Sequence, residues 1–327
     1  MSYELHQGDA LTVLRTLPES SVQCCVTSPP YWGLRRYVAE GHPTAPYQIG
    51  LEEKITDHIE KLVEAFAEVR RVLRPDGVLW LNYGSMYSSD GGSGAGGGNL
   101  RGNRRYQQRN YRTGVVPGFK EKDLIMADAM LALSLQKAGW WLRSEIIWHK
   151  PTAMPESAKD RPMRDHEKVF LLSKSECYFY DRLAATEPFR SSEHKRSRQR
   201  WISGWKAGAG KHSPVAHNLE RMRSKGGART TLDSDGRLLR TVWTIASQPF
   251  YGAHFATFPP RLAERCVLLS SRPGDTVLDP FSGAGTTGLA ACRHGRRYLG
   301  IELNPDYIEM ARVRLEADRP IWGKVPA

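Results

Sequence analysis

The sequence predicts an α/β fold, a doubly wound and mostly parallel sheet with an inserted basic region. Three observations predict it. Short apolar runs rich in β-branched residues alternate with helices of ten or more residues, an order typical of parallel sheets that helices cover on both faces. A glycine-rich turn follows one of the strands and opens a helix. Two polar, arginine-rich stretches interrupt this alternation and carry the positive charge of the chain.

The N-terminal half begins this pattern with a β-rich run at residues 22–26, which ends at Ser28-Pro29-Pro30-Tyr31. Apolar side chains recur at three- and four-residue steps across residues 55–73, which predicts an amphipathic helix. The sequence Pro75-Asp76-Gly77 predicts the end of that helix. The remaining elements of this half are strands at 78–82, 140–148 and 169–172 and a helix at 123–138, closed by Gly139.

The C-terminal half continues the alternation. Helices are expected at residues 260–269, 287–294 and 306–317, and strands at 276–279 and 298–303. Gly283, Gly285 and Gly288 have G-x-G-x-x-G spacing directly after the first of these strands, and Glu302 ends the second. Glycines permit a sharp turn and close approach of a ligand, and an acid at the next strand end can hold ribose hydroxyls.

This glycine motif alone fits a dinucleotide and S-adenosylmethionine about equally. Asp279 ends the preceding strand, where its carboxylate would repel a pyrophosphate. The same carboxylate could meet the cationic end of a sulfonium amino acid, which favours S-adenosylmethionine. A nicotinamide-dependent oxidoreductase stays as a second class of function, although it leaves the Ser-Pro-Pro-Tyr turn and the basic stretches unexplained.

Composition excludes several classes. The 327 residues are 40% hydrophobic and 25% charged, as in ordinary folded proteins, and no apolar run approaches the roughly 18 residues that span a bilayer. The N-terminus has an acid and no apolar core, so we expect no secretory signal. Five cysteines form no Cys-x-x-Cys pair, so we expect no disulfide framework, no metal site and a cytoplasmic location.

The positive charge is concentrated in two segments. The chain has 47 Lys and Arg against 35 Asp and Glu, a net charge of +12. Residues 182–240 hold 14 of the basic and 5 of the acidic residues, and residues 98–122 hold 7 and 1. The charge excess of these segments favours a polyanionic partner. We interpret 182–241 as an inserted recognition region and 88–118 as a mobile Gly/Arg-rich loop.

The Ser28-Pro29-Pro30-Tyr31 turn carries a second signal. Two prolines cannot extend a central strand, and each lacks an N–H donor, so the turn is rigid and presents acceptors beside an aromatic ring. Such a site suits a planar group that carries an NH₂, because the acceptors take its two hydrogens and the ring stacks on its face. The alternative is a plain turn in which Tyr31 packs into the core.

Taken together, the Ser-Pro-Pro-Tyr turn, the later Asp-Pro-Phe-x-Gly-x-Gly loop and their order resemble the amino-methylating DNA methyltransferases, in the permuted β group. The resemblance covers about 1–180 and 242–317 and fails in 182–240. It implies a Rossmann-like fold of the S-adenosylmethionine-dependent methyltransferases, with residues 1–180 and 242–327 as the catalytic domain. It also implies that 182–241 is the target-recognition region and that a flipped base in double-stranded DNA is the substrate.

The resemblance assigns residues by position. The expected catalytic residues are Ser28, Pro29, Pro30 and Tyr31. The expected contacts to S-adenosylmethionine are Asp9, Thr257, Asp279, Phe281, Ser282, Gly283, Gly285, Thr286, Glu302 and Asn304. The segments Trp148–Pro151 and Arg164–Glu167 resemble framework near the target pocket, and we assign their charged residues no chemical role.

The basic segments are the expected DNA contacts, because arginines give phosphate contacts and neighbouring aromatic rings give stacking. The residues singled out are Arg101, Arg104, Arg105, Arg196, Arg198, Arg200 and Trp201. The alternatives are a solvated charge run at 190–200 and a linker without a role at 91–98. The resemblance is compatible with a homodimer, with a cognate restriction endonuclease as partner, and with a bacterial, archaeal or phage source.

The base that is methylated follows from one side chain. Serine starts the turn, and in the family the serine version is associated more with N4 of cytosine and the aspartate version more with N6 of adenine. We therefore favour N4-cytosine over N6-adenine. Methylation at C5 of cytosine needs a nucleophilic cysteine, whereas Cys24 and Cys25 lie in an apolar strand. A DNA-binding protein without catalysis is a third class, against which the intact turn and loop argue.

Overall fold

The computed structural model of the chain describes residues 2–88, 115–153, 155–156, 158–187, 237–248 and 258–318. The chain divides into two compact units. One is formed by Met1–Tyr180 together with Thr241–Ala327, and the other by Asp181–Arg240. The first unit holds the central sheet, and no helix among the described residues combines the length and hydropathy that crossing a bilayer requires.

A mixed sheet of eight strands forms the centre of the first unit in the described part of the chain. Strand β7 is antiparallel to both of its neighbours, and the other neighbouring pairs are parallel. The spatial order is β1 (Tyr3–Gln7), β12 (Arg297–Glu302), β11 (Thr276–Asp279), β2 (Val22–Thr27), β3 (Leu73–Tyr83), β7 (His166–Ser173), β6 (Trp141–His149) and β10 (Val242–Thr244).

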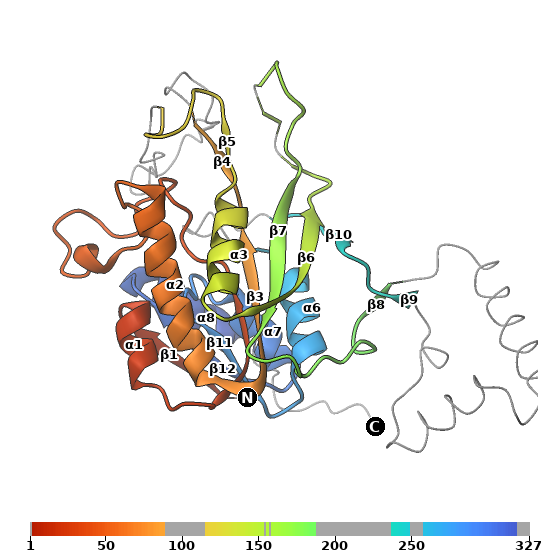
Figure 1. Cartoon of the computed structure of the whole chain (residues 1–327). Helices are drawn as coiled ribbons and strands as arrows, with labels where there is room; N and C mark the ends of the chain where they lie inside the picture. Colours follow the sequence, from red (N-terminus) through yellow and green to blue (C-terminus); the bar gives the residue numbers. More distant parts are fainter. Residues whose placement is uncertain are drawn as a thin grey trace, which may run out of the picture. The chain divides into compact units, whose positions relative to one another are not determined.

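Helices cover both faces of the sheet, as the sequence predicted (Figure 1). One face carries α1 (Ala10–Thr16), α2 (Ile55–Val72) and α3 (Ala127–Lys137), and the other carries α6 (Pro260–Ser270), α7 (Thr286–Arg293) and α8 (Pro305–Ala317). The apolar stripe expected across 55–73 is the buried face of α2, where Leu62 and Phe66 are fully enclosed. The doubly wound, mostly parallel fold is therefore confirmed.

The winding of the sheet reverses between β2 and β11, which are neighbours. From β2 the chain continues to β3 on one side, and from β11 it continues to β12 on the other. Such a switch point leaves a crevice at the carboxyl ends of the two strands, and ligands of open α/β sheets bind there. The residues that end β2 and β11 are Thr27 and Asp279.

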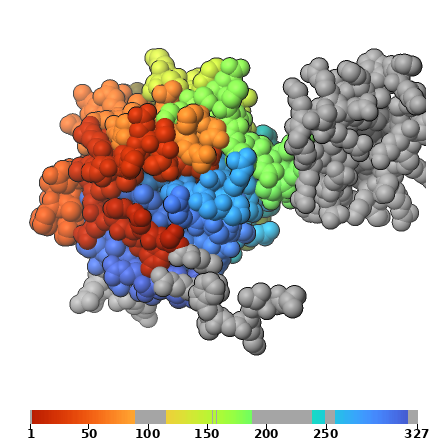
Figure 2. Space-filling view, turned by 90° about the horizontal axis from the view of Figure 1, so that it is seen from below, coloured from red at the N-terminus to blue at the C-terminus, as the bar shows by residue number. Residues whose placement is uncertain are grey.

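The two ends of the chain are joined in this sheet. Strand β1, which follows the N-terminus, pairs in parallel with β12, near the C-terminus. Figure 2 shows the red N-terminal residues lying against the blue residues that come after position 258. Neither β1 nor α1 was anticipated from the sequence, because the short run Tyr3–Gln7 is only partly buried and has a weak alternation.

Two element boundaries differ from the sequence expectation. The helix expected over 123–138 begins only at Ala127, since Leu124–Ile125 form the short strand β5, which pairs with β4 (Met86–Tyr87). The strand expected to begin at residue 78 begins at Leu73, directly after α2. Its register with β2 shifts between Val22 and Cys24, and this irregularity accommodates Pro75-Asp76-Gly77 without interrupting the strand.

In the second unit the structure describes its two flanks. Strand β8 (Thr186–Glu187) pairs antiparallel with β9 (Arg237–Leu238). The Arg240 guanidinium lies 3.3 Å from the Glu187 carboxylate, which ties the two flanks together beside the short strand pair. Residues 188–236, which include Arg196, Arg198, Arg200 and Trp201, lie outside the described residues, as do Arg101, Arg104 and Arg105.

Candidate functional site

The Ser-Pro-Pro-Tyr turn and the glycine loop meet at the switch point of the sheet. Thr27, the last residue of β2, donates a hydrogen bond of 2.7 Å from its hydroxyl to Asp279 Oδ1 at the end of β11. Ser28 follows Thr27 directly, and Gly283 lies four positions after Asp279. The fold therefore brings together two motifs that are about 250 positions apart in the chain.

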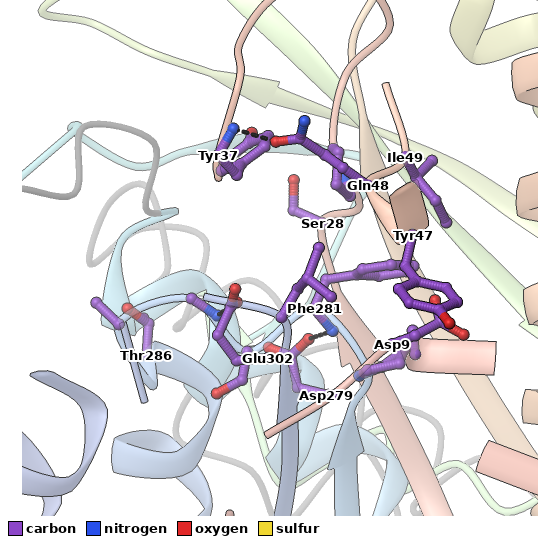
Figure 3. Close-up of a pocket in the computed structure, with 18 of the residues that line it drawn as sticks. Asp9, Ser28, Tyr37, Tyr47, Gln48, Ile49, Asp279, Phe281, Thr286 and Glu302 are labelled. Atoms are coloured by element: carbon purple, nitrogen blue, oxygen red, sulfur yellow. Dashed lines mark hydrogen bonds between the residues drawn. The ribbon is translucent and has the colours of Figure 1, made fainter. Parts of the chain in front are cut away.

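One open pocket contains both motifs (Figure 3). The space between its walls, counted together with the solvent at its open mouth, is about 810 Å³. Figure 3 places Ser28 between Tyr37 and Gln48 on one side and Phe281 and Glu302 on the other. The lining residues are Gly8, Asp9, Ala10, Ser28, Pro30, Tyr37, Tyr47, Gln48, Ile49, Phe258, Asp279, Pro280, Phe281, Ser282, Gly283, Ala284, Thr286, Glu302 and Leu303.

Glu302 is a buried acceptor at the floor of this pocket. Its Oε2 accepts a 2.8 Å hydrogen bond from the Gly283 backbone N–H, and its Oε1 accepts one of 2.9 Å from that of Asn304. Burial raises the pKa of Glu302 to about 7, although these hydrogen bonds oppose the rise. Each carboxylate oxygen has a second lone pair, so Glu302 can also accept from ligand hydroxyls in the pocket.

The backbone of the glycine loop is shaped for this contact. Gly285 has φ +75° and caps the N-terminus of α7, a left-handed conformation that side chains with a Cβ seldom adopt. A Cβ at this position would also lie 3.0 Å from the Ala311 Cβ on α8. Gly285 therefore shapes the turn from behind and does not line the pocket itself.

Asp279 is the second buried carboxylate of the pocket. Its Oδ1 accepts from the Thr27 hydroxyl and, at 3.1 Å, from the Phe281 backbone N–H, while its Oδ2 accepts from the Thr287 hydroxyl at 2.8 Å. Burial raises its pKa to about 6, against the effect of these hydrogen bonds. An approaching cation would favour the ionised form of this group.

The donor and acceptor set fits an adenosyl group that carries a cationic amino acid. Two buried carboxylates can accept from ribose hydroxyls and from an ammonium group. Aromatic side chains, Phe281, Tyr37 and Tyr47, line the same pocket and can cover a planar ring. Asp9 also lines it, but its Oδ2 already caps α1 by accepting from the backbone N–H and the hydroxyl of Thr12, both at 2.8 Å.

The turn itself divides into two halves. Ser28 and Pro30 line the pocket, whereas Pro29 and Tyr31 do not. The Tyr31 ring packs against Tyr83, with ring centroids 4.7 Å apart. Burial raises the pKa of Tyr31 well above its ordinary value, so its hydroxyl stays protonated.

A polar cluster holds the hydroxyl of Tyr31. It donates to Glu167 Oε2 at 2.9 Å, and the Asn82 amide donates to the same oxygen at 3.2 Å. Lys150 pairs with the other oxygen of Glu167, and its ammonium lies 4.3 Å from the centre of the Trp148 ring. Glu167 and Lys150 come from the two framework segments to which the sequence assigned no role, and they fix the orientation of Tyr31.

The structure therefore places most of the expected cofactor contacts in one pocket. Those that line it are Asp9, Asp279, Phe281, Ser282, Gly283, Thr286 and Glu302. Asn304 lies behind Glu302, where it caps α8 by accepting from the Asp306 N–H and donates to the Tyr37 carbonyl at 2.8 Å. Thr257 lies outside the described residues.

The sequence missed one wall of the pocket. Tyr37, Tyr47, Gln48 and Ile49 belong to the irregular segment between the turn and α2, which has no periodicity to interpret. The Gln48 Oε1 accepts from the backbone N–H groups of Tyr37 and Val38, so the segment is folded back on itself. The only available signal was that this long segment directly follows the Ser-Pro-Pro-Tyr turn, since long ordered loops are often functional.

Cysteine chemistry is disfavoured at this site. Cys24 and Cys25 are buried in β2, and burial raises the pKa of the Cys24 thiol to about 12. A thiol in this state is a poor nucleophile at neutral pH. Both cysteines are core residues, in agreement with the sequence interpretation, and among the described residues no group of three or more His, Cys, Asp or Glu could hold a metal ion.

Comparison with known proteins gives concordant results. A family model described as DNA methylase, for N6 and N4 enzymes, matches residues 22–313. The Type II methyltransferase M.Cfr9I of Citrobacter freundii is 43% identical over 320 residues, which cover 96% of this chain and 88% of the relative. The Type II methyltransferase M.XycI of Xanthomonas campestris pv. cyanopsidis is 45% identical over 318 residues, covering 95% and 87%.

Solved structures share the fold. TTHA0409 of Thermus thermophilus, in complex with S-adenosyl-L-methionine, superposes with a TM-score of 0.57 at 27% identity, covering 98% of this chain and 96% of its own. The PvuII DNA methyltransferase, which is cytosine-N4-specific, gives a TM-score of 0.60 over 96% of this chain and 86% of its own. At 19% identity the second likeness concerns the fold alone.

Proposed function

The chain belongs to the N6/N4 DNA methylase family, and from this premise we propose that it methylates the N4 amine of cytosine at a specific site in double-stranded DNA. The family membership removes the oxidoreductase alternative. It also makes S-adenosyl-L-methionine the cofactor, which when bound supplies a methyl group on a positively charged sulfur.

The buried carboxylates hold this cofactor in the proposal. Glu302 accepts from the ribose hydroxyls, and its two backbone donors fix the direction of its oxygens. Asp279 faces the cationic end of the amino acid, and its three donors keep it from rotating toward solvent. Phe281 and the segment around Tyr37 and Tyr47 exclude water from the planar base. These residues orient the methyl group toward the turn.

The turn activates the target amine. An aromatic amine is a poor nucleophile, because its lone pair is delocalised into the ring. In the proposal, Ser28 Oγ and the Pro29 carbonyl accept its two hydrogens, which favours a pyramidal nitrogen and localises the lone pair. The cofactor would supply its methyl group to this lone pair and leave as S-adenosylhomocysteine, and the methylated amine would then lose its proton to water. Positioning of this kind can supply roughly 7–11 kcal/mol of the acceleration.

The preference for cytosine rests on Ser28. A neutral hydroxyl starts the turn where an aspartate would offer a stronger acceptor, and in the family serine is associated more with N4 of cytosine. N6 of adenine is the alternative outcome of the experiment below. The basic segments with Arg101, Arg104, Arg105, Arg196, Arg198, Arg200 and Trp201 remain the proposed DNA contacts, and a cognate restriction endonuclease remains the proposed partner.

One observation carries the proposal: Ser28 and the carboxylates of Asp279 and Glu302 line the same pocket. The experiment incubates the protein with DNA and isotopically labelled S-adenosyl-L-methionine, followed by nucleoside mass spectrometry. The proposal predicts labelled N4-methylcytosine, and Ser28→Ala is the matched control, which should bind cofactor without transferring the label. Labelled N6-methyladenine would contradict the choice of base, and an unlabelled digest from the wild-type protein would contradict methyl transfer to DNA.

A further inference from the structure

A chain of buried polar groups lies behind the Ser-Pro-Pro-Tyr turn and takes no part in the mechanism above. His58, in the first turn of α2, is fully buried, with its Nε2 2.7 Å from the Tyr83 hydroxyl and its Nδ1 3.0 Å from Glu52 Oε2. Tyr83, the last residue of β3, is also fully buried, and Glu52 nearly so. Burying three such groups in an apolar core is costly unless each finds a partner.

The hydrogen bonds along this chain are continuous. The Tyr83 oxygen accepts from the Trp32 backbone N–H at 3.3 Å, and His58 Nε2 lies 2.7 Å from the same oxygen. Burial raises the pKa of Tyr83, which keeps its hydroxyl protonated. The other ring nitrogen, Nδ1, lies 3.0 Å from Glu52 Oε2. Trp32, Tyr83, His58 and Glu52 therefore form one continuous chain of hydrogen-bonded groups.

Glu52 anchors this chain as an anion. Burial alone would raise its pKa, but the hydrogen bond from His58, a backbone hydrogen bond, the electrostatic attraction of His58 and the Lys61 ammonium lower it to about 2. Lys61 Nζ lies 3.1 Å from its Oε1, and the Gly50 backbone N–H donates to its Oε2 at 2.9 Å. Since Lys61 is half exposed, this ion pair connects the buried chain to the protein surface.

Both Tyr83 and Glu52 bond to the residue that follows the turn, Trp32. Tyr83 holds the Trp32 N–H, two residues after Pro30, and the Glu52 carbonyl accepts from the Trp32 indole at 2.9 Å. The Gly50 backbone N–H donates to Glu52, and the Gly50 carbonyl accepts a 2.8 Å hydrogen bond from the Gly33 N–H. With φ +105°, Gly50 lies so close to the turn that a Cβ would be 3.1 Å from the Tyr31 carbonyl oxygen.

We propose that Glu52, His58 and Tyr83 are positioning residues for methyl transfer. They hold the peptide groups that follow Pro30 from behind and so set where Ser28 Oγ and the Pro29 carbonyl lie relative to the cofactor pocket. This inference rests on the proposed function, since it assigns a step to the same site. None of the three side chains lines the pocket. These buried polar groups therefore affect the rate of methyl transfer by fixing the position of the turn.

The first variant removes one oxygen atom. Tyr83→Phe keeps the ring against Tyr31 but removes the oxygen that bonds the Trp32 N–H and His58 Nε2. We expect the single-turnover rate of methyl transfer to fall about tenfold, because displacements of about 1 Å can cost up to about 100-fold. The dissociation constants of S-adenosylhomocysteine and DNA should stay within about twofold, since the pocket walls are unchanged.

A matched control removes a buried hydroxyl elsewhere. Ser270 in α6 is fully buried; its hydroxyl donates to the Cys266 carbonyl at 2.6 Å and accepts from the Trp80 indole at 3.0 Å. Ser270→Ala should lower the melting temperature and leave the single-turnover rate unchanged. If Tyr83→Phe keeps the wild-type rate, or if Ser270→Ala loses rate as much as Tyr83→Phe does, the proposal is overturned.

Two substitutions of His58 then test its hydrogen bond to Tyr83 and its hydrogen bond to Glu52 separately. His58→Gln retains an acceptor near Nε2 for Tyr83, and His58→Asn retains a donor near Nδ1 for Glu52. The rate should be largely rescued in His58→Gln and should fall in His58→Asn as far as in Tyr83→Phe. The double variant Tyr83→Phe with His58→Asn should be no slower than either single one, because both cut the same link. Additive losses would contradict a single chain.

The behaviour of the wild-type protein distinguishes failure of the proposed function from failure of the positioning role. If the wild-type protein transfers no methyl group to DNA, the proposed function fails, whatever the variants do. If it transfers methyl groups and Tyr83→Phe does so equally fast, the function stands and the positioning role fails. Binding of S-adenosylhomocysteine shows that each variant is folded, and the rate of Tyr83→Phe alone decides the positioning role if a His58 variant does not fold.

Discussion

The Thr27 hydroxyl donates a 2.7 Å hydrogen bond to the Asp279 carboxylate across the switch point of the sheet. Both residues are almost completely buried. Thr27 immediately precedes the Ser28 turn and Asp279 immediately precedes the glycine loop. One bond therefore joins the strand that carries the proposed nucleobase site to the strand that carries the proposed cofactor site. The relative position of the two halves of the proposed reaction depends on this pair.

Thr27→Val tests the pair. The substitution conserves shape and removes the donor, which leaves Asp279 Oδ1 with the Phe281 N–H as its remaining described partner. We expect a loss of about 1–3 kcal/mol in the free energy of unfolding, the cost of a buried acceptor that loses a partner. Urea denaturation measures it. Thr27→Ser keeps the hydroxyl and serves as control, and equal stability of the valine variant and the wild type would count against the bond.

The affinity for cofactor should depend on pH. Burial raises the pKa of Asp279 to about 6 and that of Glu302 to about 7 in the unliganded protein. An ammonium group and ribose hydroxyls favour the ionised carboxylates, so binding releases protons. Affinity for S-adenosylhomocysteine should therefore rise as the pH increases from about 5 to about 7 and level off above that. Calorimetry in buffers of different ionisation enthalpy counts the protons.

Glu302→Gln is the matched variant for this titration. It keeps an acceptor oxygen but removes one of the two ionisations, so the proton release on binding should shrink. The same pKa shifts act oppositely on the empty protein. Carboxyl groups with raised pKa values favour the folded state below about pH 4, and that contribution is lost as the pH rises through about 6 and 7. A flat affinity profile between pH 5 and 8 would contradict the assignment of both carboxylates.

Two substitutions of Tyr31 distinguish a role in stacking on the flipped base from a purely structural role. Its hydroxyl is held by Glu167 and its ring by Tyr83, so Tyr31→Phe loses one hydrogen bond and keeps the ring. If the ring covers the flipped base, Tyr31→Phe should retain most of the methyl-transfer rate. Tyr31→Ala should weaken binding of DNA that has a mismatched target base by about 1–3 kcal/mol. Unchanged binding in Tyr31→Ala would leave the ring as a core residue only.

The positive charge of the proposed recognition region, residues 182–241, should make the affinity for DNA depend on salt concentration. Replacing Arg196, Arg198 and Arg200 with glutamine should weaken DNA binding and flatten the dependence of log K on log salt by up to about 0.9 for each lost phosphate contact. Fluorescence anisotropy at several salt concentrations measures the slope. Arg312→Gln, a half-exposed arginine on α8, is a control that removes charge elsewhere. An identical slope for the triple variant and the control would argue that 190–200 is a solvated charge run.

Much of the fold was predictable because its strongest elements have local sequence patterns. The apolar stripe from Ile55 to Val72 and the glycine turn between β11 and α7 are signals within about twenty residues. The site was predictable for the same reason: Ser28, Asp279 and Glu302 each follow or end a recognisable strand, and carboxyl ends of parallel strands share one edge. The contact between Thr27 and Asp279 follows from two features of the fold: both residues end parallel strands at the same edge, and the winding of the sheet reverses between these strands.

The remainder depends on contacts that leave no local pattern. Strand β1 is short and half exposed, and it is held by pairing with β12, which lies about 295 positions later. Tyr37 and Gln48 reach the pocket from an irregular segment whose path is fixed by tertiary hydrogen bonds. His58 falls on the apolar stripe of α2, where a histidine looks like any buried residue, and only the positions of Glu52 and Tyr83 show what it does.

The most direct test of the account is a crystal structure of the protein with S-adenosylhomocysteine and a DNA duplex containing its target. We predict ribose hydroxyls on Glu302, the amino acid end beside Asp279, and an extruded cytosine whose amine contacts Ser28 Oγ and faces the sulfur. A cofactor bound away from Glu302 and Asp279, or an extruded base whose amine lies out of reach of Ser28, would contradict it.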